Sequence, residues 1–206
     1  MTDSRELQID TDLQAEDTAN YVVGAKKTVD EYAQLDANDE SLRKWKESLG
    51  LVSGANANTI GDPSDTRRVV ILEMRVEIEG REPLVFNLED PATFEKLKKK
   101  GIVIKEKANY HITAKFRVQH EIVTGLKYLQ SVKRAGVRVD RFEEICGSYG
   151  PNTKGKPYYE KSFQEEEAPS GLLARGSYEA TSKFVDDDKT TYLEFPWVFE
   201  IKKTWE

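Results

Sequence analysis

Val69-Val-Ile-Leu-Glu-Met-Arg-Val-Glu-Ile78 is the stretch that decides the fold, because apolar and charged residues alternate along it. One face of the extended chain would carry five apolar side chains: Val70, Leu72, Met74, Val76 and Ile78. The opposite face would carry Glu73, Arg75 and Glu77. A period of two indicates a strand with one buried face. The same period predicts a second strand of this kind, with Tyr110, Ile112, Ala114, Phe116 and Val118 on its buried face.

The rest of the C-terminal part also favours strands. Further strands are expected at residues 84–88, 102–105, 122–132, 158–163, 178–184 and 195–202, with no long helical pattern between them. One short helix is expected at residues 91–100, because Asp90 can cap it and Pro91 suits the first helical position. Pro196 cannot donate a ladder hydrogen bond, so the last strand is expected to lie at an edge or to bulge there. Many antiparallel strands with little helix predict an all-β sandwich for residues 66–206.

The N-terminal part has a different composition. Residues 1–50 hold 12 acidic and 6 basic side chains, and this difference equals the net charge of −6 of the whole chain. Residues 1–20 are polar and are predicted to be a disordered acidic tail. A capping box at Thr28–Glu31 and helical spacing of Leu42, Trp45 and Leu49 predict a short helical hairpin within residues 21–50. Residues 51–65 lack periodicity and are expected to be a flexible linker.

Several function classes are disfavoured by composition. The single Cys146 cannot form an internal disulfide, and two histidines with one cysteine disfavour a transition-metal site. The chain has neither glycine pattern that cradles nucleotide phosphates, and no cofactor is expected. The acidic arm argues against binding to nucleic acid, which requires a basic surface. A polar N-terminus without a signal or a long apolar run predicts a cytoplasmic protein that meets membranes only transiently.

Four short blocks carry a family resemblance, and they occur in the same order as in that family. They are Leu35-Asp-Ala-Asn-Asp-Glu-Ser-Leu-Arg-Lys-Trp-Lys-Glu47, Gly147-Ser-Tyr-Gly-Pro151, Leu173-Ala-Arg-Gly-Ser-Tyr178 and Phe184-Val-Asp-Asp-Asp-Lys-Thr190. Together they resemble the signature blocks of the Rho GDP-dissociation inhibitors, over residues 21 to 206. The resemblance implies an immunoglobulin-like β-sandwich that binds a prenyl group, preceded by a regulatory arm that binds a GTPase.

The resemblance also implies a function without catalysis. Such a protein binds prenylated Rho-family GTPases in the GDP state, slows GDP release and extracts them from membranes into the cytosol. Carried over residue by residue, the pocket for the geranylgeranyl lipid falls on Val76, Ile102, Tyr110, Ile122 and Trp197. The contacts to the basic tail of the GTPase fall on Asp140, Glu166 and Glu167, and the contacts to its body fall on Asp39, Asp187 and Asp188.

Each of these assignments has a plainer alternative. Asp39 is also placed to cap the helix that contains Leu42, and Asp187 and Asp188 also suit a solvated turn. Inward apolar residues are usually ordinary core. At the level of function, the alternative is a broader prenyl-protein shuttle that recognises the lipid and little of the protein. A hydrolase that uses carboxylates such as Asp186–Asp188 would need a raised carboxyl pKa in a pocket.

Overall fold

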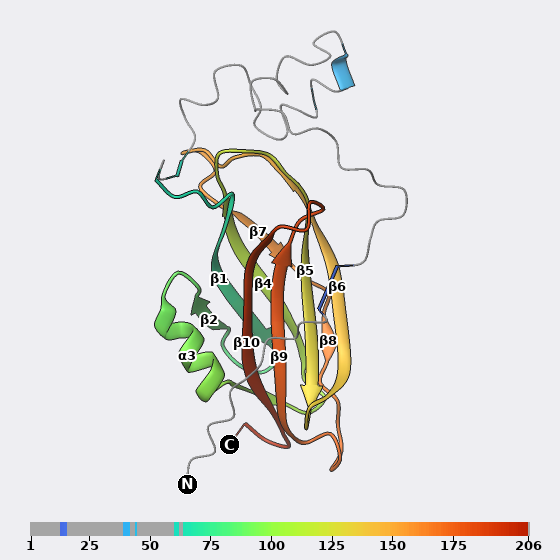
Figure 1. Ribbon diagram of the computed structural model, residues 1–206. Helices are drawn as coiled ribbons and strands as arrows, with labels where there is room; N and C mark the ends of the chain where they lie inside the picture. The colour runs from blue at the N-terminus through green and yellow to red at the C-terminus, as the bar shows by residue number, and fades with distance from the viewer. Residues whose placement is uncertain (1–12, 16–38, 42–43, 45–59, 62–63, 206) are drawn as a thin grey trace.

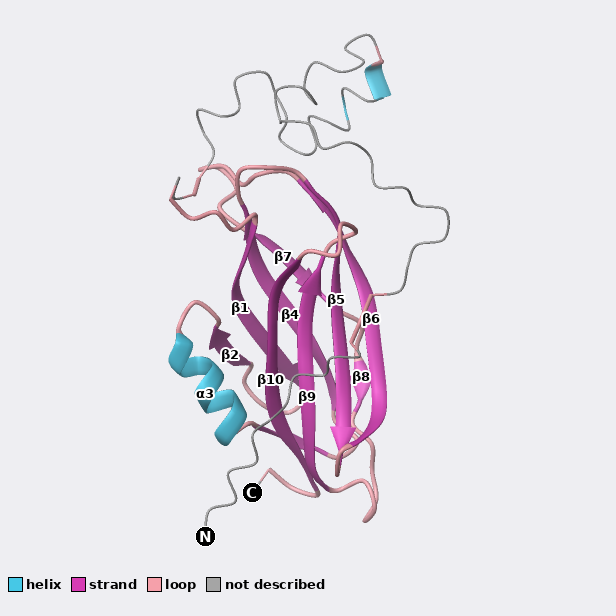
Figure 2. Cartoon of the chain, viewed as in Figure 1, coloured by secondary structure: helices cyan, strands magenta, loops and turns pink. Residues whose placement is uncertain are grey.

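The structure is a computed structural model that describes residues 13–15, 39–41, 44, 60–61 and 64–205 (Figure 1). Most of the predicted helical hairpin (21–50) and most of the predicted linker (51–65) lie outside these residues. Within 64–205 the chain forms two β-sheets that pack face to face, and one helix (Figure 2). The all-β sandwich expected from the alternation of apolar and polar residues is confirmed.

The first sheet is antiparallel. Its strands lie in the order β2 (Leu84–Asn87), β1 (Val69–Ile78), β4 (Asn109–Val118) and β7 (Tyr159–Ser162), and β8 (Glu166–Glu167) also pairs with β4. The second sheet has the order β3 (Ile102–Lys105), β10 (Thr191–Lys202), β9 (Gly176–Val185), β5 (Val123–Arg134) and β6 (Val137–Tyr149). Its one parallel pair joins β3 to β10. The two inner faces enclose one large apolar core.

The helix α3 (Pro91–Lys99) is where the sequence predicts it. The side chain of Asp90 accepts a hydrogen bond of 2.9 Å from the Ala92 amide, which satisfies one of the free donors of the first turn. Leu97 is buried, and the Phe94 ring meets the Phe195 ring of β10 edge to face at 5.4 Å. The helix therefore packs beside the second sheet.

The prediction that Leu72 lies on the buried face of β1 is wrong, because β1 contains a bulge. Ile71 pairs with Phe116 and Glu73 pairs with Lys115, so Leu72 is an extra residue without a partner on β4. One inserted residue reverses the alternation. Ile71 is therefore buried and Leu72 is half-buried, and its carbonyl accepts a hydrogen bond from the Leu88 amide instead.

The 13-residue strand β6 has no counterpart among the predicted strands. It pairs only with β5 and forms an edge of the second sheet, and its first five residues are exposed. Charged residues on an edge strand discourage pairing with other chains, and here they also hide the alternation. The same sheet qualifies the expectation for Pro196. β10 lies inside the sheet, but β3 pairs with it only from Phe199 onward, so Pro196 has a strand neighbour on one side.

Residues 13–15 pack on the outer face of the second sheet, although the tail 1–20 is predicted to be disordered (blue segment beside β6 in Figure 1). Leu13 is 1% exposed and contacts Leu129 and Val185. Arg141 donates to the carbonyl of Gln14 at 2.7 Å, and Lys183 donates to the carbonyl of Leu13 at 3.2 Å. The rest of the tail lies outside the described residues.

Candidate functional site

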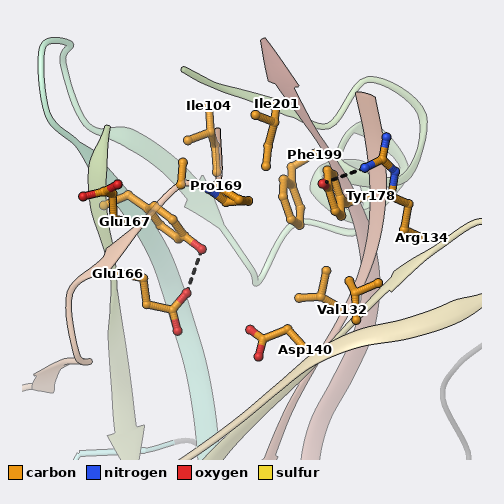
Figure 3. Close-up of a pocket in the computed structure, with 13 residues that line it drawn as sticks. Ile104, Val132, Arg134, Asp140, Glu166, Glu167, Pro169, Tyr178, Phe199 and Ile201 are labelled. Atoms are coloured by element: carbon orange, nitrogen blue, oxygen red, sulfur yellow. Dashed lines mark hydrogen bonds between the residues drawn. The ribbon is translucent and has the colours of Figure 1, made fainter. Parts of the chain in front are cut away.

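A cavity of about 380 Å³ lies between the two sheets at one end of the sandwich (Figure 3). This volume is within the range of small-molecule pockets. Both sheets contribute to its walls, which are formed by Ile104, Tyr110, Val132, Arg134, Val139, Asp140, Glu166, Glu167, Ala168, Pro169, Tyr178, Phe199 and Ile201. These residues come from the ends of β3, β4, β5, β9 and β10, the start of β6, and β8 with the residues that follow it.

The wall provided by the second sheet is mostly apolar. The rings of Tyr178 and Phe199 stack with centroids 5.0 Å apart and planes inclined by 6°. Ile104 and Ile201 lie beside them on β3 and β10, and Val132 lies on β5 (Figure 3). Alternation along each strand directs these side chains to the inner face of the sheet. The wall offers aliphatic and aromatic surface to a ligand.

The opposite side of the cavity is acidic. The hydroxyl of Tyr110 donates a hydrogen bond of 2.7 Å to the carboxylate of Glu166 (Figure 3). Burial raises the pKa of Tyr110 above its ordinary value, and the charge of Glu166 raises this pKa further. Glu167 also lines this side, and Asp140 lines the cavity from β6 of the second sheet. The cavity thus combines an apolar interior with three carboxylates, which suits a ligand that has an apolar body and a cationic neighbour.

A loop at residues 169–175, here called the closing loop, borders the end of the cavity. Arg134 donates to the carbonyls of Leu173 and Arg175 and lies over the ring of Tyr178, 5.1 Å from its centroid. Glu106 holds the other side, since it accepts from Arg175 at 2.8 Å and from the Gly171 amide at 2.9 Å. The Arg175 guanidinium, followed by that amide, lowers the pKa of Glu106 to about 2.

A smaller cavity of about 20 Å³ adjoins the first one. Tyr110 and Glu166 line both cavities, so their hydrogen-bonded pair separates them. The far side of the small cavity is aromatic and includes Tyr128, Phe142 and Phe163. The rings of Tyr128 and Phe163 stack at 4.4 Å.

The structure brings four of the sequence-predicted site residues together at the large cavity: Tyr110, Asp140, Glu166 and Glu167. Val76, Ile102 and Trp197 are buried in the core and are not among its lining residues. The Trp197 ring lies 5.4 Å from the ring of Phe199, which does line the cavity. Ile122 is half-buried immediately before β5, toward the opposite end of the sandwich.

Sequence reasoning missed most of the apolar wall. Ile104, Tyr178, Phe199 and Ile201 lie on predicted strands, and extending the alternation to the strand ends would have placed them inward. Val139 lies on β6, for which the sequence predicts no strand. No local signal marks Arg134, whose partners are about 40 residues away along the chain.

The turn after β9 is organised by Asp186, whose side chain is 2% exposed. Its carboxylate accepts hydrogen bonds from Arg68 at 3.1 Å, from the Tyr192 hydroxyl at 2.5 Å and from the Thr190 amide at 2.9 Å. Arg68 also donates to the Thr190 hydroxyl at 3.0 Å. Burial and this carboxylate raise the pKa of Tyr192. Asp186 is therefore a buried, fully engaged carboxylate that shapes the turn.

Asp187 and Asp188, assigned by the resemblance to contact with the GTPase, lie in the turn after β9, and the plainer alternative of a solvated turn does not describe them well because both side chains are only 16% exposed. Asp187 lies 3.7 Å from the Lys127 ammonium, and Asp188 lies 3.9 Å from Arg68. Gly125 of β5 has φ +60°, and a Cβ there would lie 1.8 Å from an Asp187 carboxylate oxygen. The missing side chain leaves the space into which this carboxylate fits.

Asp39 belongs to the described part of the arm and is exposed. Its carboxylate accepts a hydrogen bond of 2.8 Å from the Ser41 amide, and residues 40 and 41 are helical. This is the geometry of a helix N-cap, which uses one of the two carboxylate oxygens for this bond.

The thiol of Cys146 lies in an environment that does not activate it. Burial raises the pKa of the Cys146 thiol to about 12, so it is protonated at neutral pH and is a weak nucleophile. The described residues hold no group of three or more His, Cys, Asp or Glu side chains arranged for a metal ion. Among the same residues, no helix has the length and apolar character needed to cross a bilayer.

Comparison with known proteins agrees with this geometry. A family described as RHO protein GDP dissociation inhibitor matches residues 6–204. The Rho GDP-dissociation inhibitor of Saccharomyces cerevisiae is 50% identical over 184 residues, which cover 89% of this chain and 90% of the yeast protein. The Rho GDP-dissociation inhibitor of Schizosaccharomyces pombe is 47% identical over 185 residues, which cover 89% of this chain and 86% of that protein. The human Rho GDP-dissociation inhibitor 1 is 42% identical over 192 residues, which cover 93% of this chain and 89% of the human protein.

Proposed function

The chain belongs to the Rho GDP-dissociation inhibitor family, and from that premise we propose that it binds prenylated Rho-family GTPases in the GDP state, slows GDP release and extracts them from membranes into the cytosol. In this proposal the sandwich (66–206) is the prenyl-binding domain and residues 21–50 are the regulatory arm that contacts the GTPase. Residues 1–20 are an acidic tail and residues 51–65 are a linker. The observation that carries the proposal is the apolar cavity with an acidic side.

The cavity is large enough for most of a geranylgeranyl group. A cavity of about 150 Å³ holds the six carbons of benzene, so about 380 Å³ corresponds to roughly fifteen carbons. A twenty-carbon lipid therefore needs additional space. We propose that the Tyr110 side chain moves and joins the small aromatic cavity to the large one. Ile102, Trp197 and Val76 form part of the surrounding core, and with Ile122 they remain the proposed, more distant part of the lipid site.

The acidic side suits the residues next to the lipid. Asp140, Glu166 and Glu167 would contact the basic tail that precedes the prenylated cysteine of the GTPase. Charge-assisted hydrogen bonds between carboxylates and Lys or Arg are stronger than neutral ones. Because Glu166 also accepts from the Tyr110 hydroxyl, binding of the tail and opening of the small cavity would be coupled.

The two proposed contacts with the GTPase lie at opposite ends of the sandwich. On β9, Tyr178 lines the cavity, whereas Val185 immediately precedes the turn that carries Asp187 and Asp188. Seven residues of strand separate them, which corresponds to about 23 Å. If Asp187 and Asp188 contact the body of the GTPase and Asp39 contacts its switch region, its C-terminal tail must be extended to reach the cavity. A flexible basic tail of roughly seven residues is sufficient.

Two contacts are needed on energetic grounds. At about 0.8 kcal/mol per buried CH₂, a geranylgeranyl chain gains on the order of 10 kcal/mol in a bilayer and a similar amount in a pocket. Transfer of the lipid alone is close to balanced. The arm supplies the additional free energy, and the linker makes the second contact intramolecular, which raises its effective concentration to the millimolar range.

The test compares a prenylated Rho-family GTPase loaded with GDP with the same GTPase lacking the lipid. We expect binding of the prenylated form to be at least roughly tenfold tighter. Val139→Trp should block the cavity and remove this preference, because Val139 lines the cavity and is 53% exposed, so the larger ring can be accommodated without unfolding. Ile145→Trp, on the same strand and 59% exposed, is the control. Equal binding of both GTPase forms to the wild type would contradict the proposal.

Deletion of residues 1–50 separates the proposal from the alternative of a broader prenyl-protein shuttle. The proposed function requires the arm, so the deletion should weaken GTPase binding and abolish the slowing of GDP release. A shuttle that recognises the lipid alone would keep its affinity for prenylated cargo. Binding of a prenylated peptide measures the sandwich by itself and should be unchanged in either case.

A further inference from the structure

Two adjacent leucines in the closing loop are far more exposed than the other large apolar side chains of the described residues. Leu172 is 82% exposed and Leu173 is 88% exposed. A single exposed apolar residue is ordinary on a protein surface. Two neighbouring leucines beside the mouth of an apolar cavity form a more specific feature.

The backbone that carries these leucines is held in place. Arg134 binds the carbonyls of Leu173 and Arg175, and the Ala174 amide donates to the Gly171 carbonyl at 3.0 Å. Glu106 accepts hydrogen bonds from the Gly171 amide and the Arg175 guanidinium. The loop is thus anchored to β5 on one side and to the segment after β3 on the other. The leucines are presented outward by a constrained loop instead of folding back onto the protein.

The same end of the sandwich carries further exposed apolar groups and many basic residues. Val137 and Val139, at the start of β6, are 66% and 53% exposed. The strand ends and turns that meet here are joined by the Lys107–Ala168 and Glu106–Lys202 backbone hydrogen bonds and by the pairing of Lys105 with Lys202. The basic side chains of these elements are those of Lys105, Lys107, Lys133, Arg138, Lys202 and Lys203.

We propose that this end of the sandwich docks on the surface of an anionic lipid bilayer, with Leu172 and Leu173 inserted among the headgroups. This inference rests on the proposed function, because it concerns the site at which the lipid of the GTPase enters. Leucine side chains and surrounding Lys and Arg are the combination that binds proteins to anionic membrane interfaces. When this end of the sandwich is docked, the cavity opens toward the membrane. The prenyl chain then passes from the bilayer to the protein with little exposure to water.

The arrangement of charge favours a bilayer over a second protein as the occupant. The carboxylates of the cavity, Asp140, Glu166 and Glu167, line the side between β6 and β8. Glu106 near the loop is already bound to Arg175. Glu200 of β10 lies 3.6 Å from Lys202, so the charge of that lysine is partly balanced. The other cations and the leucines still give this end apolar and cationic side chains for an anionic surface, while the acidic side stays available for the basic tail of the GTPase.

The first experiment uses the full chain without any GTPase. Its flotation with vesicles made of equal parts phosphatidylcholine and phosphatidylserine is compared with flotation on pure phosphatidylcholine. We expect binding to the anionic vesicles that weakens with salt, and roughly tenfold weaker binding for the Leu172→Ser/Leu173→Ser double variant. Val85→Ser/Ile145→Ser removes two exposed apolar side chains elsewhere (57% and 59% exposed) and should bind as the wild type does. Lack of wild-type binding, or equal binding of the double variant, would overturn the proposal.

The second experiment measures extraction. The double serine variant should extract a prenylated GTPase from anionic vesicles several-fold more slowly, while its affinity for a prenylated GTPase delivered from a soluble complex stays unchanged. A proportional loss of that soluble affinity would instead assign the leucines to contact with the GTPase and overturn the membrane proposal. If the wild type binds no prenylated GTPase in solution, the proposed function fails, and the flotation result still decides whether this end binds membranes.

Discussion

The two ends of the sandwich use opposite construction. At the turn end, Asp186 is buried and every contact of its carboxylate is with a donor: Arg68, Tyr192 and Thr190. At the cavity end, the sheets leave about 380 Å³ unfilled. An enclosed void of that size would cost on the order of 9 kcal/mol, at about 24 cal/mol per Å³, and opening to solvent lowers this cost. The carboxylate at the turn end is therefore held by several hydrogen bonds, whereas the packing at the cavity end is incomplete and leaves room for a ligand.

The largest effect is expected from breaking the buried network at the turn end. Asp186→Asn removes the charge that faces Arg68 and leaves the guanidinium without its buried partner, which should lower the free energy of unfolding by about 3–5 kcal/mol. Asp188→Asn removes only a longer contact of 3.9 Å to Arg68 and leaves the Asp186 pair in place, so it should cost less, about 1 kcal/mol. Urea unfolding at neutral pH measures both values. Similar losses for the two variants would show that Asp186 does not organise this end.

Two glycines sharpen the comparison at the level of a single methyl group. Gly125 and Gly136 both have positive φ, +60° and +79°, so alanine is strained at either position. A Cβ at Gly125 would collide with the Asp187 carboxylate, whereas nothing lies within 4 Å of one at Gly136. We expect Gly136→Ala to cost about 1–2 kcal/mol and Gly125→Ala about 1 kcal/mol more. Thermal unfolding measures both costs, and equal values would mean that Asp187 moves aside freely.

A larger side chain should be tolerated only where the molecule is hollow. Val132→Phe extends into the cavity, so its stability should stay within about 1 kcal/mol of the wild type. Val118→Phe has no such space, since Val118 is 0% exposed within the core, and it should cost about 1–3 kcal/mol. The filled cavity should also bind prenylated peptide roughly tenfold more weakly. Comparable destabilisation by the two variants would mean that the cavity closes in solution.

The smallest effect concerns acid pH at the closing loop. The pKa of Glu106 is lowered from 4.5 to about 2. Its contacts therefore stabilise the loop fully at pH values above 4.5, the pKa in the unfolded chain, and this stabilisation is lost as the pH falls toward 2. The NMR shift of the Gly171 amide follows protonation of Glu106 in the folded protein, so it should stay constant down to about pH 3 and change with a midpoint near 2. Glu106→Gln should remove this transition. An early change, with a midpoint near 4.5, would show that Arg175 does not hold the carboxylate.

Much of the fold follows from local patterns in the chain. Alternation predicts β1 and β4, and Asp90 with Pro91 predicts α3 at its observed position. The misses have physical causes. The bulge at Leu72 depends on how β1 pairs with β4, and β6 carries its charges on an edge that needs only one buried face. Local periodicity does not report either condition.

The candidate site was only partly predictable. The acidic residues Asp140, Glu166 and Glu167 meet at the cavity, as does Tyr110, whereas most of the apolar wall was not anticipated. Alternation shows which side chains point inward, but it does not show where the two sheets fail to fill the space between them. That space depends on how strand ends from the two sheets are placed around it and on the closing loop held by Arg134.

The amino-acid sequence by itself determined that the chain forms a β-sandwich of this family, because period-two apolar patterns and short signature blocks are local properties. Only the tertiary structure decided which inward residues line a cavity, that Asp186 is buried against a residue 118 positions away, and that Leu13 packs on the outer face of the second sheet. The reason is physical: burial and cavity shape arise from the packing of segments that are distant in the chain, and no local pattern contains the distance between them.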